Sequence, residues 1–128
     1  MSTEEIPQAL GPYSLSVSAG PFLFLSGQTP IDPQTGALVG LTIEEQTHQV
    51  IDNIEAILAK EGLTLEHVVR CDVFLKEMSD FSRMNAAYAE RFSQSLKPTR
   101  TTVEVSRLPL DARVEITCIA CLEKPSKI

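Results

Sequence analysis

The spacing of apolar residues changes period several times along this chain, and these changes fix the order in which strands and helices can occur. Apolar side chains at every second position indicate strands, and those at every third or fourth position indicate helices. The resulting order is β-β-α-β-α-β-β. We predict strands at about 13–19, 22–26, 68–75, 100–105 and 113–122, and helices at about 42–61 and 80–92.

Turn and capping residues support these boundaries. Gly20 and Pro21 lie between the first two strands and indicate a hairpin. Thr42 followed by Glu45 forms a capping box at the start of the first helix. Asp80 is a suitable N-cap for the second helix.

Some strands have apolar residues on both faces, but two helices can cover only one face of a sheet. Phe22 and Phe24 alternate with Leu23 and Leu25, so both faces of that strand are apolar. We predict one α+β domain over residues 1–128, with a mixed sheet and both helices on one face. The other face would expose an apolar patch too large for a monomer, so we also predict a symmetric homo-oligomer.

Charge and composition exclude several classes of function. The net charge of −6 argues against a nucleic-acid-binding or membrane-surface protein, which needs a basic face. The longest apolar run is Phe22–Leu25, far short of the roughly 20 residues that span a bilayer. The opening MSTEEIP lacks the apolar segment of a secretory signal, and we expect a cytoplasmic protein.

Cysteine and histidine positions do not suggest a metal site. Cys118 and Cys121 form C-x-x-C, but residues three apart in a strand point to opposite faces. His48 and His67 lie in different predicted elements without ligand partners and are expected at the surface or an interface. We therefore predict no metal and no cofactor.

Two charged residues stand out within the last two strands. Arg100 opens one strand, and Glu115 lies between Val114 and Ile116 in the other. A buried charge is costly unless it has a partner. Residue types leave two interpretations open. One is an ion pair across adjacent strands, and the other is a site where Arg100 holds an acidic ligand and Glu115 places a water molecule.

Residues 100–116, RTTVEVSRLPLDARVEI, resemble the signature of the reactive-intermediate deaminase family, also called Rid or YjgF-like. Three further stretches agree with the family: GPYS at 11–14, LSGQTPIDPQTG at 25–36 and FSRMNAAYAERF at 81–92. Together they span nearly the whole chain. The similarity is greatest to the RidA subfamily.

The resemblance implies a chorismate-mutase-like fold and a homotrimer with clefts between subunits. It implies a 2-iminobutanoate/2-iminopropanoate deaminase, which hydrolyses enamines and imines such as 2-aminoacrylate and 2-aminocrotonate to 2-keto acids and ammonia. PLP-dependent dehydratases would supply these substrates. The alternatives are a non-catalytic protein that binds 2-keto acids, a purely structural trimer, and a ribonuclease or translation inhibitor, which the acidic charge disfavours.

The resemblance also assigns roles to the two charged residues. Arg100 matches the arginine that clamps the substrate carboxylate, and Glu115 matches the acid that orients or activates the hydrolytic water. Arg107 is expected to be a loop or interface charge rather than a second clamp.

Five more positions match the family's binding residues. Tyr13 resembles the tyrosine that lines the cleft, and Ser26-Gly27 resembles the backbone at the cleft floor. Asn85 resembles the asparagine of the second helix near the site. Thr102 stands where many members have cysteine, which argues against a thiol role and leaves a backbone contact with the ligand.

Overall fold

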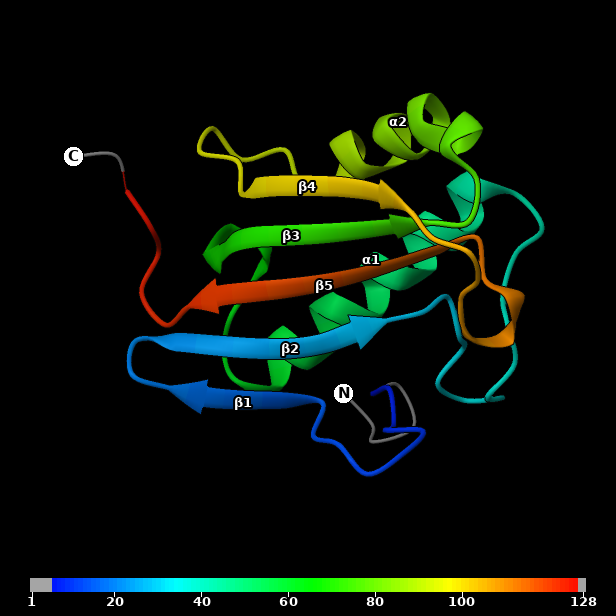
Figure 1. The fold of residues 1–128 in the computed structure, drawn as a ribbon. Coiled ribbons are helices and arrows are strands. Elements are labelled where there is room, and N and C mark those ends of the chain that lie inside the picture. The colour runs from blue at the N-terminus through cyan, green and yellow to red at the C-terminus, as the bar shows by residue number, and fades with distance from the viewer. Residues whose placement is uncertain (1–5, 127–128) are drawn as a thin grey trace.

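The computed structural model describes residues 6–126 and shows five strands and two main helices in the predicted order (Figure 1). The strands are β1 (Ser16–Ala19), β2 (Phe22–Gln28), β3 (Val68–Leu75), β4 (Thr99–Glu104) and β5 (Val114–Cys121). The helices are α1 (Ile43–Lys60) and α2 (Phe81–Arg91), with short 3₁₀ turns at Leu65–His67, Met78–Asp80 and Pro109–Asp111. The predicted α+β class and the element order are confirmed.

The strands form one mixed sheet in the order β1-β2-β5-β3-β4. β3 and β4 are parallel, which requires the crossover through α2, and the other neighbours are antiparallel. β3 therefore separates β4 from β5. The interpretation of Arg100 and Glu115 as an ion pair across adjacent strands is wrong, because their strands are not neighbours.

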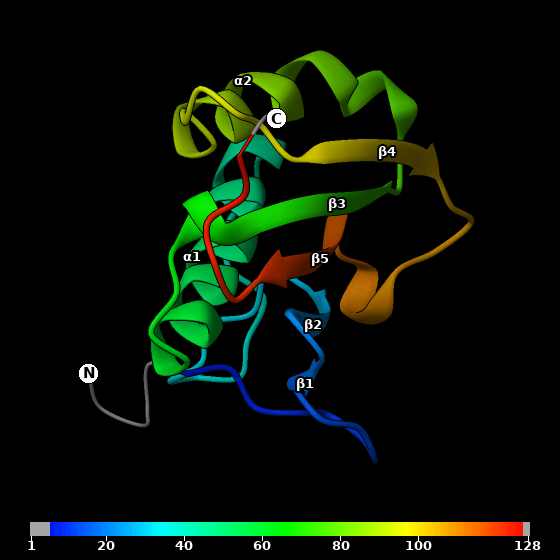
Figure 2. The same ribbon diagram turned by 90° about the vertical axis from the view of Figure 1, so that its left-hand side faces the viewer.

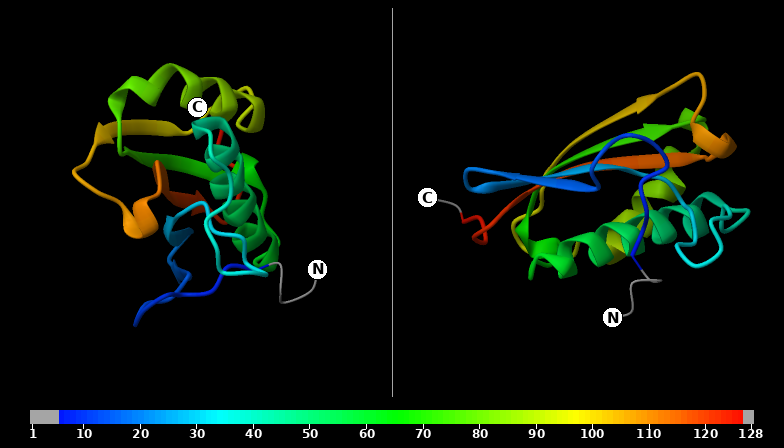
Figure 3. Two further views of the ribbon diagram at one scale, coloured as in Figure 1. Left: turned by 90° about the vertical axis from the view of Figure 1, so that its right-hand side faces the viewer. Right: turned by 90° about the horizontal axis from the view of Figure 1, so that it is seen from below.

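Both helices cover the same face of the sheet, and this places the core (Figures 2 and 3). Alternate residues of β5 face the helices, and Ile116 and Ala120 among them are fully buried. Ile51 and Ile54 of α1 belong to the same buried cluster. Because side chains alternate between the two faces of a strand, every second residue of each central strand is directed into the core.

The opposite face of the sheet, called here the open face, carries exposed apolar side chains. Phe22 is 39% exposed and Phe24 is 42% exposed, whereas Leu23 and Leu25 between and beside them are buried. Val17 lies opposite Phe24 and is also exposed. The predicted apolar face is present in the described chain. Its burial in a homo-oligomer stays a prediction.

The first hairpin differs from the prediction at both ends. β1 begins at Ser16 rather than Tyr13, because residues before it form a local turn. In that turn the Tyr13 N–H donates to the Gly11 carbonyl (2.9 Å) and the Tyr13 hydroxyl accepts from the Leu10 N–H (3.1 Å). β2 continues to Gln28, and its register with β5 shifts beyond Leu25.

The helix caps were predicted with mixed success. Thr42 and Glu45 form the expected capping box, in which Thr42 Oγ1 accepts from the Glu45 N–H (3.1 Å). Asp80 precedes α2 but makes no capping bond, and its carboxylate pairs with Arg113 instead (3.3 Å). Its predicted capping role is therefore wrong. The Asp80 carboxylate forms an ion pair with Arg113, the residue before β5, and not a hydrogen bond with the first turn of α2.

Two sequence-based expectations concern the ends of the chain and membranes. The opening MSTEEIP lies largely outside the described residues, which begin at Ile6. Among residues 6–126, neither helix is long and apolar enough to cross a bilayer.

Truncating the buried face of α1 should destabilise the protein strongly. Ile54 is fully buried beneath the sheet, so Ile54→Ala is expected to lower the free energy of unfolding by about 2–5 kcal/mol. Lys60→Ala, at the exposed end of the same helix, should change it by about 0.5 kcal/mol or less. Urea unfolding at a fixed protein concentration measures both. Equal losses would contradict the burial of this helix face.

Candidate functional site

The predicted site residues fall into two groups on opposite faces of the sheet. Arg100 and Thr102 of β4 face α2, which carries Asn85; we call this group the Arg100 half-site. The second group, the Glu115 half-site, lines one cavity on the open face and consists of Tyr13, Ser26, Gly27 and Glu115. The structure brings the members of each group together but does not bring Arg100 to Glu115 within one chain.

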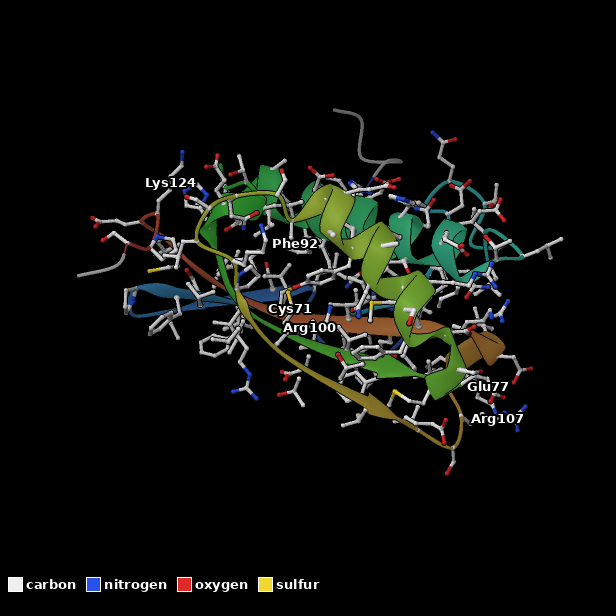
Figure 4. All side chains as sticks on the ribbon, turned by 90° about the horizontal axis from the view of Figure 1, so that it is seen from above. Cys71, Glu77, Phe92, Arg100, Arg107 and Lys124 are labelled. Carbon is white, nitrogen blue, oxygen red and sulfur yellow. The ribbon has the colours of Figure 1, made fainter. Side chains whose placement is uncertain are left out.

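Aromatic rings of α2 hold the Arg100 guanidinium. Its carbon lies 4.9 Å from the Tyr88 ring centroid and 5.6 Å from the Phe81 ring centroid. A guanidinium over a ring face gains about 0.5–2 kcal/mol. Tyr88 itself stacks on Phe92, with 4.5 Å between ring centroids. Figure 4 shows Arg100 beside Cys71, its register partner on β3.

Arg100 differs from the other arginines because it has no carboxylate partner among residues 6–126. The other five arginines all pair: Arg70 with Asp72, Arg83 with Glu44, Arg91 with Asp52 and Glu55, Arg107 with Asp111, and Arg113 with Asp80. The planar fork of Arg100 is therefore free to bind an external carboxylate with two parallel hydrogen bonds.

Three buried polar atoms without a partner lie on the two elements that flank this guanidinium. Asn85 Oδ1, the Tyr88 hydroxyl and Thr102 Oγ1 are buried and lack a hydrogen-bond partner within the described part of the chain. Each such group costs about 1–3 kcal/mol unless a partner, water or ligand satisfies it. All three come from α2 or β4, as does Arg100. The contact between α2 and β4 thus contains hydrogen-bonding oxygens that no partner in residues 6–126 satisfies.

Phe81 and Tyr88 pack against the Arg100 guanidinium, and the sequence-based prediction did not include them among the candidate site residues. They were assigned only to the apolar stripe of α2. The available signal was their spacing of seven residues, which puts both rings on one helix face. What the sequence did not reveal is that this face lies over Arg100.

The Glu115 half-site surrounds a cavity of about 430 Å³ on the open face. Tyr13, Ser26, Gly27 and Glu115 line it, together with Leu10, Thr29 and Pro109. Ser26 and Gly27, which line this cavity, lie where the register between β2 and β5 shifts after Leu25. There the Ser26 hydroxyl donates to the Ser14 carbonyl (2.6 Å) and ties the preceding loop to β2.

A second cavity adjoins the first. Its volume is about 210 Å³, and Leu10, Tyr13, Gly27 and Thr29 line both. Tyr13 stands between the two spaces. A ligand at Glu115 therefore has room for an additional group beyond Tyr13.

The Glu115 carboxylate is half-buried and has no cation partner among residues 6–126. Burial raises the pKa of Glu115 above its ordinary value. The carboxylate lies directly over Gly27, where an added Cβ would be 3.1 Å from Glu115 Cδ and in contact with Oε2. The absence of a side chain at Gly27 thus makes space for the acid, whose raised pKa suits it to accept and return a proton.

The structure also shows where the two cysteines of the C-x-x-C motif and the two histidines lie. Cys118 is buried on the helix-facing side of β5, and Cys121 is on the open face, as their spacing predicted. His48 contacts Glu90 (3.1 Å) at the surface. His67 Nδ1 accepts from the Thr64 N–H (3.0 Å) and closes a short turn. No cluster of three metal-ligating side chains occurs in residues 6–126.

Comparisons with known proteins agree over almost the whole chain. The family described as endoribonuclease L-PSP matches residues 3–122. A RutC family protein of Pyrococcus horikoshii is 52% identical over 121 residues, covering 94% of this chain and 95% of that one. The 2-iminobutanoate/2-iminopropanoate deaminase of Salmonella typhimurium is 40% identical and covers 94% of each chain.

A solved structure supports the fold. The structure of Escherichia coli TdcF with bound serine has a TM-score of 0.87 and 36% identity, covering 94% of this chain and 95% of that one. Fold and site together define a small α+β protein with an arginine that has no carboxylate partner in residues 6–126 and a separate half-buried acid. The chain belongs to the endoribonuclease L-PSP family, the Rid or YjgF-like family of the sequence resemblance. The resemblance and the predicted chorismate-mutase-like fold are confirmed.

Adding one methyl group at Gly27 should displace the acid without unfolding the protein. In Gly27→Ala the new Cβ would collide with the end of a flexible side chain, so the free energy of unfolding should fall by about 1 kcal/mol or less. The Glu115 carboxyl resonance should shift in carbon-detected NMR. Ser26→Ala removes a neighbouring hydroxyl without adding bulk and should leave that resonance in place. An unchanged Glu115 environment in Gly27→Ala would contradict the close approach.

Proposed function

We propose that this protein is a 2-iminobutanoate/2-iminopropanoate deaminase whose active site forms between two copies of the chain. The Arg100 half-site of one copy would meet the Glu115 half-site of its neighbour in a homotrimer. One observation carries the proposal. Among residues 6–126, Arg100 lacks an acidic partner and Glu115 lacks a basic one, and the sheet separates them.

The open face gives the physical reason for association. It carries Phe22, Phe24 and Val17 exposed, and apolar surface of this kind is stabilised by burial against another copy. The edge strand β4, which carries Arg100, has a neighbour on one side only. Closed symmetry would bring each such edge to the open face of the next copy, repeating the same site in every interface.

Arg100 would bind the carboxylate of the substrate. Its guanidinium is already oriented by Phe81 and Tyr88, so little rotational freedom remains to be lost on binding. The buried Thr102 and Asn85 oxygens nearby would gain partners from the amino group, from ordered water or from the neighbouring copy. The substrate carbon would then lie at a fixed distance from the clamp.

Glu115 would handle water and protons. An enamine such as 2-aminoacrylate tautomerises to its imine, whose carbon is electrophilic. The oxygen of a water molecule bonds to that carbon while the π electrons move to nitrogen, and the water proton passes to Glu115. Glu115 passes this proton to nitrogen, which gives a carbinolamine with one hydroxyl and one amino group. Glu115 then takes the hydroxyl proton and delivers it to the amino nitrogen. The C=O bond forms as the C–N bond breaks, and ammonia and a 2-keto acid leave. Burial raises the pKa of Glu115, which makes its carboxylate a stronger base for the first transfer.

The names of relatives support the proposal at the level of the family. The Salmonella protein is named for this reaction, and the E. coli structure holds serine, a small molecule with a carboxylate and an amino group.

The family description also names an endoribonuclease. The net charge of −6 disfavours RNA as a substrate. A non-catalytic 2-keto-acid-binding protein would use the same arginine, and only turnover separates it from an enzyme. The supply of substrate by PLP-dependent dehydratases and the cytoplasmic location stay predictions.

Wild-type protein is expected to accelerate the conversion of 2-aminoacrylate, generated in situ by a serine dehydratase, to pyruvate. Arg100→Ala should lower kcat/KM by about 100-fold or more because the substrate loses its fixed orientation. Glu115→Gln should lower kcat by about 100-fold or more while a 2-keto acid still binds. Stopped-flow absorbance of 2-aminoacrylate measures the rates, and calorimetry measures the binding.

The matched control for the clamp is Arg107→Ala. Arg107 is an exposed arginine paired with Asp111 on the loop before β5, and its removal should leave the rate within about twofold of wild type. A folded wild type that binds 2-ketobutyrate without accelerating any enamine or imine would instead support the non-catalytic alternative.

Mixing two inactive variants tests whether the site is shared. Arg100→Ala and Glu115→Gln, unfolded together and refolded at equal amounts, should recover about a quarter of wild-type activity, because a quarter of randomly formed sites receive both intact residues. Separately refolded proteins mixed afterwards serve as the control. No recovery, despite mixed oligomers detected by native mass spectrometry, would place both residues of the site in one subunit.

A further inference from the structure

Two cysteines unused by the proposed reaction lie directly opposite each other in the core. Cys71 of β3 pairs with Cys118 of β5 in the antiparallel register, and both side chains point toward the helices. Their sulfur atoms are 3.5 Å apart. Both thiols are buried, with 0% and 2% of their surface exposed. Cys121, the third cysteine, lies on the open face.

The backbone already has the spacing that a disulfide needs. Directly opposed residues of antiparallel strands have Cα atoms about 4.5–5.5 Å apart. Disulfides form at Cα separations of about 4.4–6.8 Å with an S–S bond of about 2.05 Å. The two Sγ atoms must therefore approach by about 1.5 Å, which side-chain rotation can supply. The strands need not separate or shift register.

The two thiols have different surroundings, and this gives each a separate role. Cys71 is the register partner of Arg100 on β4, so a positive charge lies close to it. A hydrogen bond from Cys118 is the main cause that lowers the pKa of Cys71, and the charge of Arg100 acts in the same direction. That hydrogen bond and burial raise the pKa of Cys118. The charge of Arg100 favours the thiolate of Cys71, and Cys118, directly opposite in the register, is placed to attack the oxidised Cys71 sulfur.

We propose that Cys71 and Cys118 are a modification site, at which a hydroperoxide converts the pair to an intramolecular disulfide. The Cys71 sulfur attacks the O–O bond, forms a sulfenic acid and releases water (or an alcohol). The Cys118 sulfur then displaces the hydroxyl group, forms the S–S bond and releases a second molecule of water. The two thiols together lose two electrons and two protons. The peroxide accepts these electrons and protons as its O–O bond is reduced.

The Arg100 half-site offers the approach for the oxidant. Cys71 is the register partner of Arg100, and the buried oxygens of Asn85, Tyr88 and Thr102 lie on α2 and β4, the two elements that flank Arg100. Hydrogen peroxide is small, uncharged and able to form hydrogen bonds with such oxygens. Cys118 lies on the middle strand of the sheet, where it contacts β3 and belongs to the buried apolar cluster. Oxidation therefore begins at Cys71.

The test uses the full chain in its native, assembled state. Reduced protein is treated with hydrogen peroxide, quenched with catalase, and denatured in the presence of an alkylating reagent. Free thiols should fall from three per chain to one, and the intact mass before alkylation should fall by about 2 Da. Peptide mapping should join Cys71 to Cys118. A dithiol reductant should restore all three thiols. The oxidised form should melt several degrees higher, because the bond closes a loop between residues 47 positions apart.

Variants distinguish this site from unspecific oxidation. Cys121→Ser should still lose about 2 Da, because it keeps the pair intact. Cys118→Ala should instead gain about 16 or 32 Da at Cys71, since no resolving thiol is present. The proposal is wrong if native wild type retains both buried thiols while Cys121 is oxidised, or if the crosslink found joins Cys121 of two chains.

Discussion

The arrangement of this protein depends on one constraint, which is that two helices cover only one face of a five-stranded sheet. Side chains alternate along each strand, so every second residue is directed into the core and the others face outward. On β5 this rule buries Ile116 and Cys118 and leaves Glu115 on the open face. The same rule on β4 directs Arg100 toward α2. The positions of the core residues, of Glu115 and of Arg100 all follow from the face of the sheet that each residue occupies.

The sheet order then prevents the two charges from meeting within one chain. β3 lies between β4 and β5, and Arg100 and Glu115 point to opposite sides. Neither charge has an oppositely charged neighbour among residues 6–126. The Arg100 guanidinium packs against aromatic rings, and the Glu115 carboxylate lies over Gly27, which has no side chain. A charge held in this way remains available to a ligand or a second copy, whereas the other arginines are neutralised by carboxylates on their own chain. The apolar open face supplies the burial that would bring a second copy close.

Much of the fold was accessible from sequence because it rests on local rules. The element order followed from apolar periodicity, and Thr42 and Glu45 capped α1 as predicted. The prediction failed where a distant contact outweighed a local preference. Asp80 had a suitable position for an N-cap, but Arg113, 33 residues away in sequence, binds its carboxylate. Tyr13 had the pattern of a strand, but a turn closed by its own hydroxyl removed it from the sheet.

The sequence by itself determined the family, the order of elements and the residue types of the site, since motif and periodicity are properties of the chain alone. Only the tertiary structure decided which of these residues share a space. It separated Arg100 from Glu115, placed Phe81 and Tyr88 against the guanidinium, and set Cys71 opposite Cys118. The reason is physical. Strand order and register join residues far apart in sequence, and the same local pattern fits several pairings until the whole core is packed.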